Sequence, residues 1–435
     1  MTTATKNISF NEALPALFGA QFSANGWFAG REAALKQFLA LGGIPTVKEE
    51  DWKYTNVVPF FKNDIQVTLP EVPEVTAAQL EATGLLLPDT YRLVLVNGVM
   101  QAHLSQLPPA TQVTVSKLSE AGSQPAVERY FHQSPKISEF HFAQLNAALF
   151  NDGLFIEVKA KAQVEQPIQV VHLYLADQPR LFNPRHLVVV NEGASVQIVE
   201  SAAGIGLTDN VVINSVTESI VSERAQLSQY QLQTGGNQLR FINQNLVEQK
   251  GKSLYNNYTF TLTDSDFVRN NLNISLDEER TETHMYGFYI AAGSQLIDNH
   301  TSVDHRMPHC ESNELYRGVL MDKATGVFNG KIYVHEDAQK TNAFQQNNNL
   351  VISPDAAIYT KPQLEIFADD VKCSHGCTIG QVSDDALFYL RARGIGEAEA
   401  RNLLVKAFAF DITAKVTIPA VRKQVEQIAS QYLHA

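Results

Sequence analysis

Hydrophobic and polar positions alternate with a period of two through the middle of the chain, from about residue 154 to 381. The alternation is clearest in Leu254–Leu262 and in Val268–Leu276. A period of two is typical of β-strands whose two faces differ. No helical period interrupts this region, which excludes alternating βα units and predicts an all-β body.

A degenerate repeat divides this body into units of roughly 30 residues, the range typical of solenoids. Asparagine is also frequent, as in Asn256-Asn257 and Asn270-Asn271. Parallel strands that stack coil on coil satisfy inward amides by pairing them with their neighbours. The pattern therefore favours a parallel β-helix over a β-sandwich. The residues that introduce the repeated strands are Ala194, Ala225, Lys252, Ser294, Ala324 and Ala356.

The pattern is helical on both sides of the β body. Arg31–Leu41 places its apolar residues on one stripe and ends at Gly42-Gly43. Trp52 is expected to anchor the helical region on the β body, with a ligand held by Trp52 and Tyr54 as the alternative. We expect an N-terminal helical or mixed domain over residues 1–153, a β-helix core over 154–381 and a C-terminal helical domain over 382–435.

The C-terminal region predicts several helices, with Ser383 as the N-cap of the first. The last helix carries apolar residues at three- and four-residue steps, which form an amphipathic stripe. Such a stripe either packs on the body or presents a surface to another protein. The candidate partner-binding residues are Leu403, Phe408, Ile418, Val421, Val425 and Ile428.

Composition narrows the classes of function. The net charge is −12 and no basic run occurs, which argues against nucleic acid or an anionic membrane as a main partner. No apolar stretch has the length of a membrane span, and the N-terminus lacks the pattern of a secretory signal. Three cysteines are too few for a disulfide framework and fit a reducing compartment. These features predict a cytoplasmic protein.

One short segment carries metal-binding residue types. Cys373, His375 and Cys377 alternate with other residues, so on a β-strand all three share one face. Thiols and imidazole are ligands for soft or borderline metals. Alternate residues on a strand lie roughly 6.6 Å apart, so one strand offers at most part of a site. The remaining ligands would come from a neighbouring strand or a second protein, and three unrelated residues are the alternative.

A second cluster, residues 298–311, contains three histidines, several carboxylates and Cys310. Its spacing matches neither a zincin helix nor a zinc finger, so polar turns and internally satisfied histidines are favoured over a metal site. Cys310 could face Cys373 across adjacent coils. The chain has no phosphate-binding loop, nucleophile elbow or dinucleotide fingerprint, which predicts that it is not an independent enzyme.

Residues 360–395, TKPQLEIFADDVKCSHGCTIGQVSDDALFYLRARGI, closely resemble the SufB/SufD family of iron–sulfur cluster assembly proteins, and within it the SufD type. The resemblance spans essentially the whole chain. It includes the segments KEEDWKYTNV, VDHRMPHCESNELYRGVL, VFNGKIYV and KTNAFQQNNNLVISPDA.

This resemblance implies a right-handed parallel β-helix between helical domains. It also implies a non-catalytic scaffold subunit that pairs with SufB and docks a copy of the ATPase SufC on its C-terminal helices. Cys373 and His375 match the metal- or cluster-associated pair at the SufB–SufD interface. Cys377 departs from the family pattern, in which a small residue is common, so Cys377 and Cys310 are only additional candidate thiols.

The resemblance further implies a transient iron–sulfur cluster or iron shared with SufB, and no tightly bound cofactor in the isolated chain. An isolated chain could also pair with itself as a homodimer. The alternative is a β-helix enzyme acting on polysaccharide, a lyase or hydrolase that uses Asp264, Asp266 or Asp304. That alternative requires a secretion signal and a long groove, and the sequence indicates neither.

Overall fold

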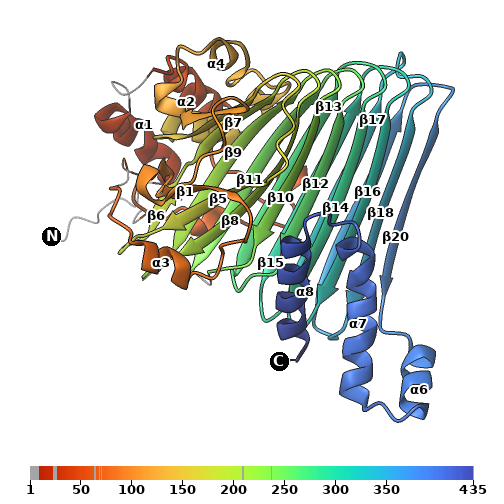
Figure 1. The fold of residues 1–435 in the computed structure, drawn as a ribbon. Coiled ribbons are helices and arrows are strands. Elements are labelled where there is room, and N and C mark those ends of the chain that lie inside the picture. Colours follow the sequence, from red (N-terminus) through yellow and green to blue (C-terminus); the bar gives the residue numbers. More distant parts are fainter. Residues whose placement is uncertain are drawn as a thin grey trace.

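The computed structural model describes residues 9–22, 27–62, 65–67, 69, 71–207, 210–236 and 238–434. Its centre is a parallel β-solenoid of about eight turns, with helices at both ends of the chain (Figure 1). Successive strands enter two sheets alternately, so each coil adds one strand to each sheet. The first sheet has the order β2-β1-β5-β8-β10-β12-β14-β16-β18-β20, and the second has the order β19-β17-β15-β13-β11-β9-β7-β4-β3 with β6 beside β9. The predicted mainly-β solenoid is confirmed.

The helices are α1 (Phe10–Gln21), α2 (Arg31–Ala40), α3 (Ala77–Ala82), α4 (Pro125–Tyr130), α5 (His141–Leu149), α6 (Asp384–Ala392), α7 (Glu397–Thr413) and α8 (Pro419–His434). The first ten strands are β1 (Tyr91–Val96), β2 (Val99–Met100), β3 (Val113–Lys117), β4 (Gly153–Val158), β5 (Ile168–Tyr174), β6 (Arg180–Phe182), β7 (Arg185–Val190), β8 (Ser195–Gly204), β9 (Val211–Val221) and β10 (Gln226–Gln233). The others are β11 (Leu239–Gln249), β12 (Leu254–Thr261), β13 (Phe267–Leu276), β14 (Glu282–Ala291), β15 (Leu296–His305), β16 (Glu311–Leu320), β17 (Thr325–Val334), β18 (Asn342–Val351), β19 (Ala357–Ile366) and β20 (Lys372–Gly380).

The corner that leads into the first sheet repeats in each coil. One residue takes a left-handed conformation, with φ of 58° at Arg224 and 62° at His309, and its N–H donates to a carbonyl of the next coil. The residue that follows is small and buried, as at Ala225 and Cys310. The predicted repeat treated two different corners of the coil as one. Strands of the first sheet follow Ala194, Ala225 and Lys252. Strands of the second sheet follow Ser294, Ala324 and Ala356.

Inside the solenoid, aliphatic side chains fill most of the space and stacked amides fill part of it. Asn243, Asn270 and Asn299 stand in register on β11, β13 and β15. The Nδ2 of Asn243 donates to Oδ1 of Asn270 at 2.9 Å, and the Nδ2 of Asn270 donates to Oδ1 of Asn299 at 3.0 Å. The predicted ladder of inward amides is confirmed for these three residues, because their amides are hydrogen-bonded from coil to coil.

The N-terminal region covers one end of the solenoid. Helix α2 begins and ends where the sequence predicts, and it packs with α1, α5 and Trp52 in one apolar cluster. Trp52 is buried, and the guanidinium of Arg269 on β13 lies 3.7 Å from its ring centroid. This contact confirms Trp52 as an anchor. Strand β1 already pairs with β5, so the sheets begin before residue 154.

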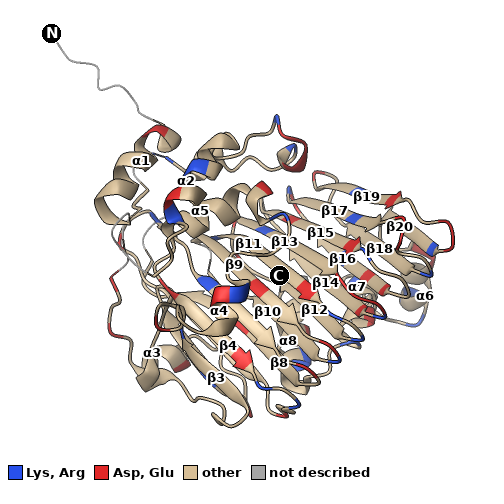
Figure 2. Ribbon diagram, turned by 90° about the horizontal axis from the view of Figure 1, so that it is seen from above, with Lys and Arg blue, Asp and Glu red and all other residues tan. Residues whose placement is uncertain are grey.

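The C-terminal helices differ in what they contact. Helix α8 lies against the outer face of the first sheet, whereas α6 and the start of α7 extend beyond the ends of the strands (Figure 1). Strand β20 ends at Gly380 and α6 begins at Asp384. None of the described helices is long and apolar enough to cross a membrane. Acidic and basic residues are interspersed along the turns (Figure 2).

The amide ladder predicts a difference between two neighbouring asparagines. The substitution Asn270→Ala leaves the amides of Asn243 and Asn299 without their partners, so we expect the free energy of unfolding to fall by about 3 kcal/mol. Asn273→Ala on the half-exposed outer face of the same strand is the control, with an expected change within about 0.5 kcal/mol. Urea unfolding measures both. Equal losses at the two positions would contradict an energetic role for the ladder.

Candidate functional site

The solenoid stops at an open end. Strand β20 pairs only with β18, and β19 pairs only with β17, so each sheet ends in a strand with one unpaired edge. Both strands belong to the last coil, at the blue end of the strands in Figure 1. An unpaired edge leaves backbone N–H and C=O groups free to bind another chain. The open end is therefore the part of the solenoid best suited to an interface.

Cys373, His375 and Cys377 lie on β20 at this open end. They stand in register with Ala343, Gln345 and Asn347 of β18, which are 0%, 1% and 0% exposed. Parallel in-register neighbours point to the same side of a sheet, so the three side chains face the interior of the solenoid. They share one face of a strand, as their spacing predicts. They are more exposed than the residues below them because no further coil covers them.

The three side chains have different surroundings. Cys373 is partly buried against the apolar cluster that contains Ala343 and Leu364, and this burial raises the pKa of its thiol. Cys377 is exposed, and its Sγ lies 3.4 Å from the hydroxyl of Thr360 on β19. The side chain of His375 is exposed. A thiol whose pKa is raised stays protonated until a metal displaces its proton.

One chain supplies only part of a metal site here. Within the part of the chain that the structure describes, no group of three or more His, Cys, Asp or Glu residues is arranged to hold a metal ion. The open end therefore offers the ligand types of a soft-metal site, thiol and imidazole, without a complete ligand set.

Cys310 does not belong to this end. It occupies the small-residue position of a corner, and its Sγ donates to the carbonyl of Glu278 at 3.3 Å. Cys373 stands in register with Ala343 and, one coil further, with Ser312. The prediction that Cys310 faces Cys373 across adjacent coils is wrong. The two residues lie two coils apart and are not in register with each other.

The three histidines of the 298–311 cluster also lie apart and point in different directions. His300 lies on the outer face with its Nε2 3.0 Å from Asp298, whereas His305 points inward and its Nε2 lies 2.9 Å from the hydroxyl of Ser312. His309 is a left-handed corner residue. The expectation of an internally satisfied histidine is confirmed for Nε2 of His305, whereas its buried Nδ1 has no hydrogen-bond partner among the described residues.

The carboxylates proposed for polysaccharide chemistry already bind other side chains, and one of them lies far from the other two. Asp264 accepts a hydrogen bond from Tyr432 at 2.7 Å, and Asp266 forms an ion pair with Arg240 at 2.6 Å. Asp304 lies at the other end of the strands, roughly 30 Å away at the rise of a β-strand. The paired carboxylates of glycosidases are about 5 to 9.5 Å apart. Asp304 therefore cannot act together with either of the other two.

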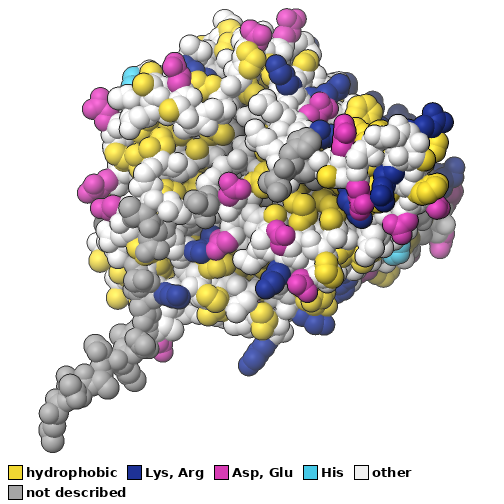
Figure 3. Space-filling view, turned by 90° about the horizontal axis from the view of Figure 1, so that it is seen from below, with side chains coloured by type: hydrophobic (Ala, Val, Ile, Leu, Met, Phe, Trp, Pro, Cys, Tyr) yellow, Lys and Arg dark blue, Asp and Glu magenta, His cyan; other side chains and the backbone are white. Residues whose placement is uncertain are grey.

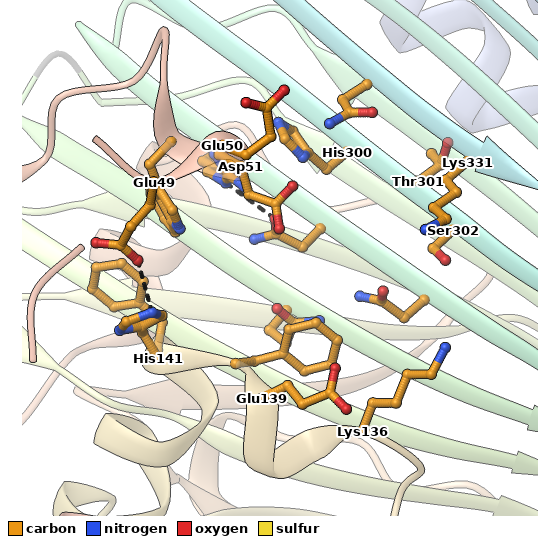
Figure 4. Close-up of a pocket in the computed structure, with 18 of the residues that line it drawn as sticks. Glu49, Glu50, Asp51, Lys136, Glu139, His141, His300, Thr301, Ser302 and Lys331 are labelled. Carbon is orange, nitrogen blue, oxygen red and sulfur yellow. Dashed lines mark hydrogen bonds and ion pairs between the residues drawn. The ribbon is translucent and has the colours of Figure 1, made fainter. Parts of the chain in front are cut away.

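A groove of about 490 Å³ separates the N-terminal segments from the outer face of the second sheet (Figure 4). Its walls carry many ionisable side chains, and each labelled basic side chain has an acidic neighbour. His141 lies 3.0 Å from Glu49, and Lys136 lies 3.5 Å from Asp304. The floor is formed by β15 and includes the outward side chain of Ser302. Oppositely charged side chains therefore pair along the walls of the groove.

Below the open end lies a buried acid that the sequence did not single out. Glu314 on β16 is 4% exposed, and its Oε2 accepts a hydrogen bond from Nε2 of Gln345 at 2.6 Å. Burial raises the pKa of Glu314 to about 7, although the hydrogen bond from Gln345 opposes the shift. No spacing motif marks Glu314, because its burial depends on the coils above and below it.

The C-terminal helices correct part of the prediction for partner binding. Ile418, Val421 and Val425 are 6%, 0% and 0% exposed, because they pack on the chain's own first sheet together with residues such as Tyr258 and Phe260. These three are therefore not available to a partner. Phe408 and Ile428 are partly buried in the same cluster, and only Leu403 of the six predicted residues is exposed.

Other apolar side chains of these helices are exposed instead. Phe388 and Tyr389 on α6 are 74% and 57% exposed, and Phe410 on α7 is 59% exposed. In Figure 3 hydrophobic side chains lie among charged ones at the right of the view, where α6 and α7 project. Sequence reasoning missed these three residues, because an apolar helix residue gives no local sign of whether another element covers it.

The fold and its open end define a class of protein, a β-solenoid with helical ends that presents thiol and imidazole groups where its strands stop. Residues 173–408 match the family described as SUF system FeS cluster assembly, SufBD core domain, and residues 19–170 match the SufBD protein N-terminal region.

Three relatives extend this match. An iron–sulfur cluster assembly SufBD family protein of Synechocystis is 32% identical over 400 residues, which cover 89% of this chain and 87% of the relative. The iron–sulfur cluster assembly protein SufD of Escherichia coli is 29% identical over 402 residues, 89% of each chain. SufD of Bacillus subtilis is 28% identical over 304 residues, 69% of each chain. The chain belongs to the SufB/SufD family of iron–sulfur cluster assembly proteins and is SufD-like.

The buried carboxyl of Glu314 predicts a pH-dependent stability. Its pKa is about 7 in the folded chain and near the ordinary 4.5 when unfolded, so its contribution is fully present below 4.5 and is lost as the pH rises to 7. Glu314→Gln mimics the protonated form. We expect it to raise the free energy of unfolding by about 3 kcal/mol at about pH 8, with the gain shrinking as the pH falls towards 4.5. Urea unfolding across this pH range measures the difference. A gain that does not depend on pH would show that the carboxyl does not titrate in this window.

Proposed function

We propose that this chain is a non-catalytic scaffold subunit of a cytoplasmic complex that assembles nascent iron–sulfur clusters. In this proposal the open end of the solenoid pairs with a SufB-type partner, and Cys373 and His375 contribute half of a shared metal or cluster site. The cluster or iron is the cargo of the complex and is not a resident cofactor of this chain. ATP hydrolysis belongs to a SufC-type partner.

The observation that carries the proposal is the position of Cys373 and His375 on a strand with an unpaired edge. An edge of this kind invites pairing with another chain, and large apolar side chains surround it. Among the residues that the structure describes, nine of the fifteen exposed large hydrophobic residues lie between residues 344 and 410. They include Phe344, Tyr359, Ile366, Phe367 and Ile379 on or next to the last strands. Gathered exposed apolar residues are typical of a protein interface.

The chemistry of the two side chains suits a cluster that is passed on. Thiolate binds iron–sulfur clusters, and an imidazole in place of a thiolate raises the reduction potential of the cluster. A site split between two chains opens when the chains move apart. Full ligation by four buried cysteines of one chain would instead hold the cluster permanently. A half-site that carries one thiol and one imidazole therefore fits assembly followed by release.

Cys377 ranks below these two residues. It shares their face, but its Sγ lies against the hydroxyl of Thr360 on the opposite sheet. Its side chain is more exposed than that of Cys373. In the proposed complex Cys377 is an extra thiol, and Cys310 is a corner residue without a role in the site.

The docking of an ATPase partner is assigned to α6 and the exposed face of α7. Phe388, Tyr389, Leu403 and Phe410 provide exposed apolar surface on these helices. Helix α8 contributes by fixing α7 to the sheet, since Val405 and Ile412 of α7 belong to the same buried cluster as Val421. Movement of the partner would reach the solenoid through this cluster.

The role of His375 can be tested by substitution. His375→Ala should abolish cluster assembly by the purified complex and leave the complex intact, because the imidazole is exposed on the last strand and supports no packing. Anaerobic reconstitution followed by absorption and Mössbauer spectroscopy measures the cluster. Size-exclusion chromatography measures the complex.

Ser374→Ala is the matched control for this experiment. Ser374 is the exposed neighbour whose side chain points to the opposite face of β20, in register with Phe344. We expect it to assemble clusters as the wild type does. Normal cluster assembly by the His375→Ala complex would refute the proposed half-site, and loss of the complex would make His375 structural.

The two kinds of apolar residue on the C-terminal helices should respond differently. Phe388→Glu together with Phe410→Glu should weaken binding of the ATPase partner at least about tenfold without lowering the melting temperature, because both side chains are exposed. Val421→Glu should instead unfold the tail, because it buries a charge against the sheet. Calorimetric binding and circular dichroism separate these outcomes.

Lys423→Glu on the exposed side of α8 is the charge-matched control and should change neither property. Unchanged affinity in the Phe388→Glu, Phe410→Glu double variant would place the docking surface elsewhere.

A further inference from the structure

In the first sheet, side chains that stand in register on successive strands form a row, which we call a rung. One rung runs from the interior to the open end and carries three polar side chains. Glu314 on β16 stands in register with Gln345 on β18, and Gln345 stands in register with His375 on β20. Neighbouring strands lie roughly 4.8 Å apart, so each side chain lies next to the following one. The rung therefore places one amide between a buried carboxylate and the imidazole at the open end.

The amide of Gln345 has a defined direction. Its Nε2 donates to Oε2 of Glu314 at 2.6 Å. Above its pKa of about 7 the carboxyl of Glu314 is ionised and can only accept, so the carbonyl Oε1 is the end of the amide left over. Oε1 is buried and has no hydrogen-bond partner among the described residues. Gly330 on β17 makes room for this arrangement, because a Cβ there would overlap Nε2 of Gln345.

We infer that Gln345, oriented by Glu314, accepts a hydrogen bond from a ring N–H of His375 and thereby fixes which imidazole nitrogen is free to bind metal. Glu314 and Gln345 are then positioning residues for the half-site. This inference rests on the proposed function of His375 as a ligand. It assigns roles to two buried residues that have no contact with the cargo.

General chemistry explains why such a pair is useful. A histidine that binds metal through one ring nitrogen usually donates its other N–H to a carbonyl or carboxylate, which fixes the tautomer and the orientation of the ring. An unpaired buried carbonyl costs free energy, and a hydrogen bond from His375 would remove that cost. The arrangement thus stabilises the chain and orients the ligand with the same contact.

The neighbouring rung supports this interpretation. Asn347 lies below Cys377, and its Oδ1 accepts from Nδ2 of Asn349 at 2.6 Å. Its own Nδ2 is the buried end without a described partner. The free end is therefore a donor below the thiol, whose sulfur can accept, and an acceptor below the imidazole, whose ring N–H can donate. The two amides are oriented oppositely, each in the sense that suits the side chain above it.

The tautomer of His375 tests the inference directly. The full chain is labelled with [15N]histidine, and the ring nitrogen shifts are recorded at about pH 8.5, above the ordinary pKa of an imidazole. The resonances of His375 are identified by their loss in His375→Gln. We expect one tautomer in the wild type, and a mixture of both tautomers in Gln345→Met and in Glu314→Gln.

Two controls remove similar groups elsewhere. Asn347→Leu deletes the next inward amide of the same strand, and Glu200→Gln neutralises another carboxyl whose pKa burial raises to about 7, far from the open end. Neither should change the tautomer of His375. Glu314→Gln also guards against misfolding, because neutralising this buried acid is expected to stabilise the fold.

A metal titration provides the second readout. Co²⁺ alone is added anaerobically to the complex of this chain with its SufB-type partner, and the thiolate-to-metal absorption is followed. We expect Gln345→Met and Glu314→Gln to weaken Co²⁺ binding about 10- to 100-fold, the usual effect of losing a partner of a metal-bound histidine. Asn347→Leu and Glu200→Gln should bind as the wild type does.

The outcomes separate the inference from the proposed function. The same tautomer of His375 in the wild type, Gln345→Met and Glu314→Gln would overturn the inference, even if His375→Ala abolishes cluster assembly. Conversely, a tautomer that depends on Gln345 together with normal assembly by His375→Ala would leave the positioning intact and refute the half-site.

Discussion

The structure depends on one constraint, the in-register stacking of parallel coils. The backbone N–H groups of an interior strand pair with the two neighbouring coils, and each side chain lies directly above its equivalent one coil earlier. The side chain of a residue must therefore pack with, or hydrogen-bond to, the side chains in register with it on the two neighbouring coils. Asn243, Asn270 and Asn299 meet this condition by sharing hydrogen bonds, and the corners meet it with a left-handed residue followed by a small buried one.

The same constraint explains where the reactive side chains lie. Stacking satisfies every coil except the last, which has a neighbour on one side only. Strands β19 and β20 consequently keep a free edge, and the inward face of β20 is open. Cys373 and His375 occupy positions that would be buried core in any earlier coil, as Ala343 and Gln345 are one coil below. Interior positions become ligand positions because the stack ends.

The helices at both ends fix the solenoid without closing this edge. Trp52 and Thr55 attach the N-terminal region to the outer face of the second sheet, where Thr55 donates to the buried carboxylate of Asp298 at 2.5 Å. Arg269 binds the same carboxylate at 2.8 Å and holds the pKa of Asp298 at about 2 against the effect of burial. Helix α8 covers the outer face of the first sheet. Both attachments lie on the sides of the solenoid, so the last coil remains available.

The sequence by itself determined the class of fold, the amide ladder and the shared face of Cys373 and His375, because a period of two and a repeat of coils are local properties of the chain. It also indicated the family through the motif around KCSHG. Only the tertiary structure decided which face of each strand or helix is covered. A local pattern is the same whichever face is covered, so the burial of Cys310 and Val421 and the exposure of Phe388 could not be assigned from the sequence. The pairing of Glu314 with Gln345 was invisible for the same reason, since it joins residues 31 positions apart in sequence that meet only when the coils stack.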